Sequence, residues 1–228
     1  MNIQSSFDHF LIYSKNLEND FEKFKRKFDF PIIYPVTNYG SFKSAMFSCR
    51  NSIIELVNFD NPAIPNSLKN NSLWFSGFAL ISSASIENIK KDLQNLNLSV
   101  SDIIIQYVKN KEGDSIPISK ILLVNNLIQN LQIFFIEYLN SFLLKIFEEV
   151  SKISKWEIVN FKINEELKER IKNQLIQIGF TSSKDLIFSD MRKIQFSFEK
   201  SNSEIPRINS FNIKSEKEII NLVEFFEV

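Results

Sequence analysis

Two glutamates, Glu55 and Glu137, lie within apolar runs that otherwise have the composition of buried strands, SIIELVNF (residues 52–59) and QIFFIEYL (residues 132–139). An unpaired carboxylate in an apolar sheet is costly, so each must face water, find a partner or hold a metal. Apolar residues flank both, which favours a cavity over the solvent-facing side of one-sided strands. As a carboxylate pair, one protonated and one ionised, they would suit general acid and base catalysis.

Three further kinds of side chain could do chemistry. His9, the sole histidine, lies in the apolar run FDHFLIYS (residues 7–14) and is either a metal ligand or a hydrogen-bonded structural residue. Asn38, Tyr39 and Lys43 in TNYGSFKS (residues 37–44) either close over a substrate or belong to a plain hairpin. Cys49, the sole cysteine, is expected to be a small strand residue, because no second histidine could activate it.

The elements that must position these residues form an internal repeat of a strand, an amphipathic helix and three strands. The first unit has strands at residues 7–14, 31–36, 42–49 and 52–59 and a helix over residues 17–27. The second unit has strands at residues 74–82, 101–108, 119–126 and 132–139 and a helix over residues 85–96. Each unit thus closes with a strand that carries one of the two glutamates.

A fainter third unit follows, with strands at residues 156–163, 184–190, 193–201 and 207–215 and a helix over residues 164–178. It lacks a glutamate inside its last strand, since Glu199 lies at the polar end of IQFSFEKS. The final segment, SEKEIINLVEFFEV, has the period of a helix. The prolines and asparagines of DNPAIPNSLKNNS predict an exposed linker between units one and two.

Paired βαβββ units with a histidine early in the first strand and a glutamate in the last resemble the vicinal oxygen chelate superfamily, the glyoxalase and dioxygenase fold. FDHFLIYSKNLENDFEKF, PVTNYGSFKSAMFSCRNSIIELV, GFALISSASIENIKKDL and FFIEYL carry the resemblance over roughly residues 6–140, which looks closest to the bacterial glyoxalase-like group. It implies an α+β fold in which units 1–60 and 72–140 form a curved mixed sheet around a cavity. Residues 141–228 would add a degenerate third unit with a terminal helix.

The resemblance also implies a divalent metal, Mn, Fe, Zn or Ni, held by His9, Glu55 and Glu137. The fourth ligand of the superfamily falls at Gly77, which has no ligating group. The site therefore has at most three protein ligands, or has lost its metal. If a metal binds, Glu55 and Glu137 would be the residues that also move a proton.

Strand alternation places side chains two apart on one face. It predicts that Phe7, His9, Leu11 and Tyr13 share a face of the first strand. Ile54, Leu56, Ile136 and Tyr138 would then face the helices, and Glu55 and Glu137 the cavity.

Composition narrows the function. The 27 basic and 27 acidic residues cancel, which gives no electrostatic support for a nucleic-acid or membrane partner. The N-terminus resembles no signal peptide, so we expect a cytoplasmic protein. The leading expectation is a glyoxalase-like protein that binds a small organic molecule in a sheet-lined cavity and, if it is active, is a metal-dependent lyase, isomerase or dioxygenase. The alternatives are a metal-free protein that binds or sequesters such a molecule, and an interaction protein that uses unit three. An uncovered third unit would dock onto the first two, or pair with a second copy in a homodimer.

Overall fold

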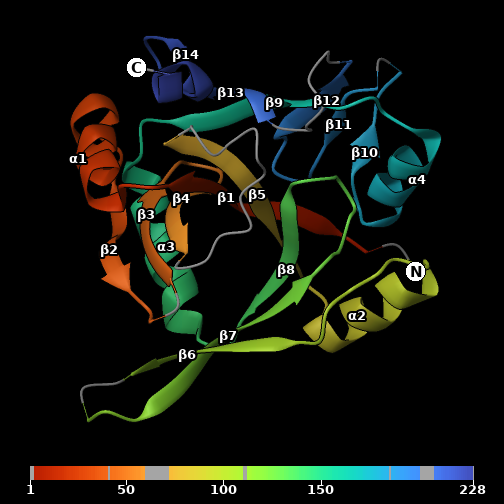
Figure 1. Cartoon of the computed structure of the whole chain (residues 1–228), viewed down its shortest axis with the longest axis horizontal. Coiled ribbons are helices and arrows are strands. Elements are labelled where there is room, and N and C mark those ends of the chain that lie inside the picture. The colour runs from red at the N-terminus through yellow and green to blue at the C-terminus, as the bar shows by residue number, and fades with distance from the viewer. Residues whose placement is uncertain are drawn as a thin grey trace.

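The computed structural model describes residues 3–40, 42–59, 72–109, 112–184, 186–200 and 208–227. It has two sheets, of eight and six strands (Figure 1). The first unit comprises β1 (Ser5–Ser14), α1 (Leu17–Phe28), β2 (Ile32–Asn38), β3 (Phe42–Ser48) and β4 (Ile53–Phe59). The second comprises β5 (Leu73–Ser82), α2 (Ile86–Asn95), β6 (Ile104–Lys109), β7 (Ser115–Leu123) and β8 (Gln132–Tyr138). The predicted linker at residues 60–71 lies outside the described residues.

The two units join at their opening strands to make the eight-stranded sheet, in the order β2-β3-β4-β1-β5-β8-β7-β6. In each unit the opening strand runs parallel to the closing one, β1 with β4 and β5 with β8. Between the units β1 and β5 run antiparallel. The predicted fold class, paired βαβββ units in a curved mixed sheet, is confirmed.

A helix and a second sheet complete the chain. They comprise α3 (Ser141–Ile153), β9 (Glu157–Asn164), α4 (Glu169–Gln177), β10 (Thr181–Ser182), β11 (Phe188–Ser189), β12 (Gln195–Glu199), β13 (Ile208–Lys214), β14 (Ile219–Asn221) and the 3₁₀ helix η2 (Leu222–Glu227). The strand order is β10-β11-β12-β9-β13-β14. β9 runs parallel to β12 and antiparallel to β13, just as β1 runs parallel to β4 and antiparallel to β5. The C-terminal part is therefore one βαβββ unit plus the opening strand of another.

The predicted terminal helix is wrong in part, because Ile219–Asn221 forms β14 on the edge of β13 and only Leu222–Glu227 is helical, as a 3₁₀ helix. As a strand, residues 219–221 form backbone hydrogen bonds with β13 that they would not form as the first turn of a helix. Among the described residues no helix is both long and apolar enough to cross a membrane.

One hydrophobic core joins the two sheets. It contains the inward faces of α1 and α2, at Phe21, Phe24, Ile89 and Leu93, as the helical period predicts. Unit three covers the outer face of β1 and β5 (Figure 1), where aromatic rings interlock. The central rings are Phe7, Phe10, Phe75, Phe161, Phe196 and Phe211.

Of the two arrangements expected for unit three, the structure shows the one in which it packs on the first two units. The open apolar face that motivated a homodimer is thereby covered within one chain. The homodimer stays a prediction, and it now needs a different surface.

Candidate functional site

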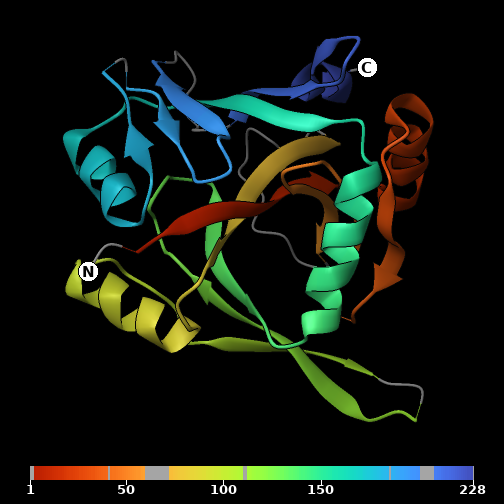
Figure 2. The ribbon, with the colours of Figure 1, turned by 180° about the vertical axis from the view of Figure 1, so that it is seen from behind.

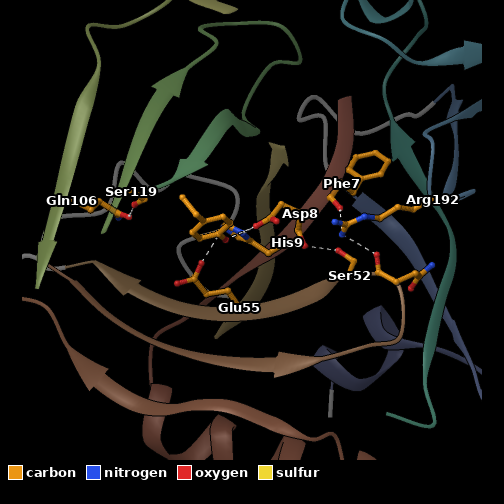
Figure 3. Close-up of polar contacts among 10 residues, drawn as sticks. Phe7, Asp8, His9, Ser52, Glu55, Gln106, Ser119 and Arg192 are labelled. Atoms are coloured by element: carbon orange, nitrogen blue, oxygen red, sulfur yellow. Dashed lines mark hydrogen bonds and ion pairs between the residues drawn. The ribbon is translucent and has the colours of Figure 1, made fainter. Parts of the chain in front are cut away.

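The site forms around an irregularity in β1, the central strand. Opposite β5, Phe7 pairs with Leu80 and His9 pairs with Ala79, so Asp8 is an extra residue in a β-bulge. The bulge puts Phe7 and His9 on opposite faces of the sheet. Phe7 packs in the core beside Phe10, whereas His9 faces the concave side (Figure 3). The prediction that Phe7 and His9 share a face is wrong for this reason.

On the concave side Asp8, His9 and Glu55 form a buried chain of acid, imidazole and acid (Figure 3). His9 Nδ1 lies 2.7 Å from Asp8 Oδ2, and His9 Nε2 lies 3.3 Å from Glu55 Oε2. The three residues are 3–6% exposed. The predicted approach of His9 and Glu55 is thus present in the structure, and Asp8 is a third member that the strand pattern did not single out.

The surroundings of Asp8, His9 and Glu55 shift the pKa values of these three groups in different directions. Burial by itself lowers the pKa of His9, but the hydrogen bond that His9 donates to Asp8 and the charge of Glu55 raise it to above the ordinary value. Burial tends to raise the pKa of Asp8, yet the contact with His9 and the Tyr138 hydroxyl bring it below its ordinary value. Burial raises the pKa of Glu55, against the opposing effects of His9 and Ser44. The geometry therefore favours an ionised Asp8 beside a protonated imidazole.

The second unit contributes Tyr138 to this chain. Its hydroxyl donates to Asp8 Oδ2 at 2.6 Å, and burial together with the charge of Asp8 raises the pKa of the phenol well above its usual range. Tyr138 lies on β8 in the apolar cluster of the concave face, with Phe134 and Ile136. The prediction that Ile136 and Tyr138 face the helices is therefore wrong.

The prediction that Glu137 lies at the site is also wrong, because the neighbouring Tyr138 faces the concave side and adjacent residues of a strand face opposite sides. Glu137 lies on the opposite face of β8 from Tyr138, where its Oε2 accepts a hydrogen bond from Ile86 N at the start of α2. Lys120 Nζ lies 3.7 Å from the same oxygen. Glu137 thus stabilises a helix N-terminus instead of meeting His9.

The register of the strands identifies what the second unit places opposite His9. In the first unit Leu11, two residues after His9 on β1, pairs with Glu55 on β4. In the second unit Ala79, two residues after Gly77 on β5, pairs with Phe134 on β8, so Phe134 is the counterpart of Glu55. The Phe134 ring lies beside His9, with 5.5 Å between the ring centroids. A Cβ at Gly77 would lie 1.8 Å from the carbonyl oxygen of Gln132, so no side chain fits there.

The residues present do not fit the metal that the resemblance implies. Two of the three predicted ligands meet, and a phenyl ring occupies the place from which the second unit would supply its carboxylate. Among the described residues no group of three or more histidine, cysteine or acidic side chains is arranged to hold a metal ion. A metal with protein ligands normally needs three or four of them.

The predicted substrate-binding loop is split between the two faces of the sheet. Tyr39 is half-buried and stacks on Phe42, which packs against the apolar cluster of the concave face, and burial followed by the charge of Glu55 raises its pKa. Lys43 instead forms an ion pair with Glu18 of α1 at 3.1 Å, on the outer face. Asn38 accepts from Gly40 N at 2.8 Å, as in a plain hairpin turn.

A pocket of about 460 Å³ opens beside Asp8, at the end of the concave face that α3 covers. α3 lines this pocket, and Figure 2 shows the helix lying beside β2. Its Phe147 packs on Tyr34 of β2 and Tyr138 of β8. The walls are the β3–β4 turn (residues 48–53), α3, Ile81, Asp8 and Arg192. Asp8 Oδ2 is used by His9 and Tyr138, whereas Oδ1 has no partner among the described residues. Oδ1 is therefore the oxygen left to accept a hydrogen bond from a bound molecule.

The third unit holds the bulge in place through the turn between β11 and β12 (Figure 3). Asp190 Oδ2 accepts from Phe7 N at 2.8 Å, and Arg192 Nη1 donates to Phe7 O at 2.9 Å and to Asn51 O at 3.2 Å. The sequence contained one usable signal for this arrangement. Phe7 and Phe10 are three apart with two polar residues between them, which breaks strand alternation as a bulge does.

These features define an α+β protein of βαβββ units with a buried acid–imidazole–acid chain on the concave face. No family model and no curated protein matches the sequence. Among solved structures, the chain is similar to a hypothetical protein from Staphylococcus aureus, with 15% identity and a TM-score of 0.69 over 95% of this chain and 93% of that one. At that identity the likeness shows the fold alone, and it includes unit three.

Methylmalonyl-CoA epimerases are more distant neighbours in fold. The enzyme from Mycobacterium tuberculosis has 11% identity and a TM-score of 0.44, covering 60% of this chain and 89% of that one. The enzyme from Streptomyces coelicolor has 14% identity and the same TM-score, covering 61% of this chain and 100% of that one.

Proposed function

We propose that this chain binds a small organic molecule, without a metal, in the pocket between Asp8, the β3–β4 turn and α3. The observation that carries the proposal is the Asp8 carboxylate, which is buried and ionised and has one oxygen left over in the pocket wall. This oxygen lies in the wall of an open pocket and is not sealed in the core, so a donor on a bound molecule can reach it. Apolar side chains of Ile53, Ile81, Leu144 and Phe147 would cover the body of the molecule.

The test is to fill the pocket from its exposed side. Leu144 on α3 lines the pocket and is 41% exposed, so Leu144→Trp adds bulk with little strain. Lys145→Trp, on the neighbouring residue that does not line the pocket, is the matched control. Native mass spectrometry of the purified protein and a ligand-observed NMR fragment screen would detect bound molecules. We expect Leu144→Trp to lose them and Lys145→Trp to keep them; equal binding by both variants would contradict the proposal.

Independence from a metal has its own test. The melting temperature should not change across a concentration series of Mn, Fe, Zn and Ni. A rise in proportion to the logarithm of the concentration of one ion, absent in a His9→Gln variant, would restore the metal-dependent function. The ligand screen, run with chelator and with each ion, should likewise give the same affinities.

A second function fits the same residues, namely proton transfer to or from a carbon of the bound molecule. The observation that favours it is the row of Asp8, His9 and Glu55, in which the imidazole would carry a proton between two carboxyl groups. Asp8, the one of the three residues that lines the pocket, would exchange the proton with the bound molecule, with His9 as its proton partner and Glu55 behind the imidazole. Any molecule found by the screen would be incubated in D₂O with wild type, His9→Gln and Glu55→Gln. Deuterium incorporated at carbon by wild type alone supports an enzyme; none with wild type leaves the binding function.

A further inference from the structure

We infer that the molecule bound in this pocket carries an acidic group, a carboxylate or phosphate, next to a hydrogen-bond donor. The inference rests on the proposed function and names the ligand class of the same pocket. Two arginines from different parts of the chain line the pocket, Arg50 from the β3–β4 turn and Arg192 from unit three. Guanidinium groups bind carboxylates and phosphates through paired hydrogen bonds.

Arg192 is fixed in place without using up its donors. Its Nη1 donates to the carbonyls of Phe7 and Asn51, which holds the guanidinium at the junction of β1 and the β3–β4 turn. Its Nε and Nη2 have no partner among the described residues. Its charge also lowers the pKa of Asp8, so the guanidinium lies near that carboxylate. The group is thus oriented at the pocket with donors to spare.

Arg50 has the same arrangement on the other side of the turn. Its Nε donates to Ser154 O at 2.8 Å, just after α3, and its two terminal nitrogens have no partner among the described residues. Each arginine is therefore held through a single nitrogen, which donates to two backbone carbonyls in Arg192 and to one in Arg50. Neither forms an ion pair with a described acidic residue within 4 Å, although acidic side chains line the same pocket.

The charges around the pocket balance, which limits the ligand further. Arg50 and Arg192 face Asp8 and Glu148, and Glu148 forms an ion pair with Lys152 at 3.2 Å on the solvent side of α3. Asp8 has no such partner on its free oxygen. An acid alone would satisfy the arginines and leave Asp8 Oδ1 unmatched. A hydroxyl or amino group beside the acid would satisfy both ends, so a 2-hydroxy or 2-amino acid, or a comparable phosphate ester, fits best.

The test uses matched probes that differ in the acidic group. Mandelate is compared with methyl mandelate, and benzyl phosphate with benzyl alcohol, by isothermal titration against the full chain. We expect at least one acid to bind about tenfold or more tightly than its neutral partner, as a charge-assisted arginine pair should provide. Arg192→Gln and Arg50→Gln should each reduce that preference, and the exposed Arg170→Gln on α4 should keep it. Comparing the two pairs tells a carboxylate site from a phosphate site.

The outcomes separate the ligand class from the pocket. Acid and neutral probes that bind equally, or a preference for acid that survives both arginine substitutions, would overturn the acidic ligand and leave the pocket standing. No binding of any probe, together with no effect of Leu144→Trp in the fragment screen, would overturn the pocket as well. Because Arg192 also holds Phe7, each variant is checked by its melting temperature. If Arg192→Gln unfolds, Arg192→Lys and Arg50→Gln carry the test, with a weaker preference expected for both.

Discussion

Replacing Asp8 with asparagine should change the protonation of His9 and the stability of the whole fold. Asp8 and His9 are both buried, and Asp8 Oδ2 accepts from His9 Nδ1 at 2.7 Å and from the Tyr138 hydroxyl at 2.6 Å. Hydrogen bonds to charged groups contribute about 1.5–3 kcal/mol each, and asparagine keeps the shape and part of the bonding. We therefore expect Asp8→Asn to lower the free energy of unfolding by about 2–3 kcal/mol near pH 6.

The pH dependence gives the prediction its sign. The folded protein raises the pKa of His9 above the ordinary value of 6.5, so it binds this proton more tightly than the unfolded chain does. The resulting stability is fully present below pH 6.5 and is lost as the pH rises through the folded pKa, at up to about 1.4 kcal/mol per pH unit. Asp8→Asn removes the main partner of the imidazolium. Its loss of stability should be largest at pH 6 and smaller at pH 9.

The assay is unusually direct because the chain has one histidine. The ring signals of His9 can be followed by NMR through a pH titration without assignment, and urea unfolding can be followed in parallel by tryptophan fluorescence. We expect the pKa of His9 to be lower in Asp8→Asn than in wild type. A pKa that is unchanged, or a stability difference that does not depend on pH, would refute the charge-coupled chain and leave Asp8 as an ordinary hydrogen-bond acceptor.

Four further substitutions test the fold and the corrected positions. Gly77→Ala should prevent folding or cost several kcal/mol in urea unfolding, because its Cβ would collide with the Gln132 carbonyl; Gly113→Ala, with open space but a φ of +93°, should cost about 1 kcal/mol. Glu137→Gln should lower the free energy of unfolding by about 1 kcal/mol and leave ligand affinity unchanged; a lost ligand would return Glu137 to the site. Phe161→Ala should cost about 3–5 kcal/mol and preserve one cooperative transition, and two separate transitions would show that the sheets fold independently.

Helical period and the order of strands could be predicted because both are local properties. Phe21 and Phe24 recur on one face of α1, and Ile89 and Leu93 on one face of α2, so composition alone identifies their buried sides. The repeated strand–helix–strand order then fixes the class of fold. In unit three the same patterns predict the helix but not the closing strand, because β12 runs parallel to β9 whereas β13, predicted as the last strand of the unit, runs antiparallel to it.

The face of a strand is not a local property when both of its faces are buried. In β8 the four residues before Glu137, Ile133–Ile136, are all apolar and all buried. Alternation then gives no sign of which side is concave, and the register with β5 decides it. For β1 the bulge at Asp8 changes the side halfway along the strand. The ambiguity in β8 explains why Glu137 was predicted on the wrong face, and the bulge in β1 explains why Phe7 was predicted to share a face with His9.

Contacts between distant parts of the chain could not be predicted at all. The turn that contains Asp190 and Arg192 looks like an ordinary exposed turn in the sequence, and its link to Phe7 depends on how unit three packs. The same holds for the pocket, whose walls come from unit one, α3 and unit three.

Because the turn between β11 and β12 holds β1 in place, β1 is not fully supported until that turn has been synthesised. β1 leaves the ribosome before the groups that hold Phe7 and before the rings of Phe161 and Phe211 that cover its neighbours, which are made some 150–200 residues later. Until then the central strand has an uncovered apolar face and an unsupported bulge. We therefore expect nascent chains that end before β12 to be bound by chaperones, and the site beside Asp8 to form only after the turn between β11 and β12 has been made.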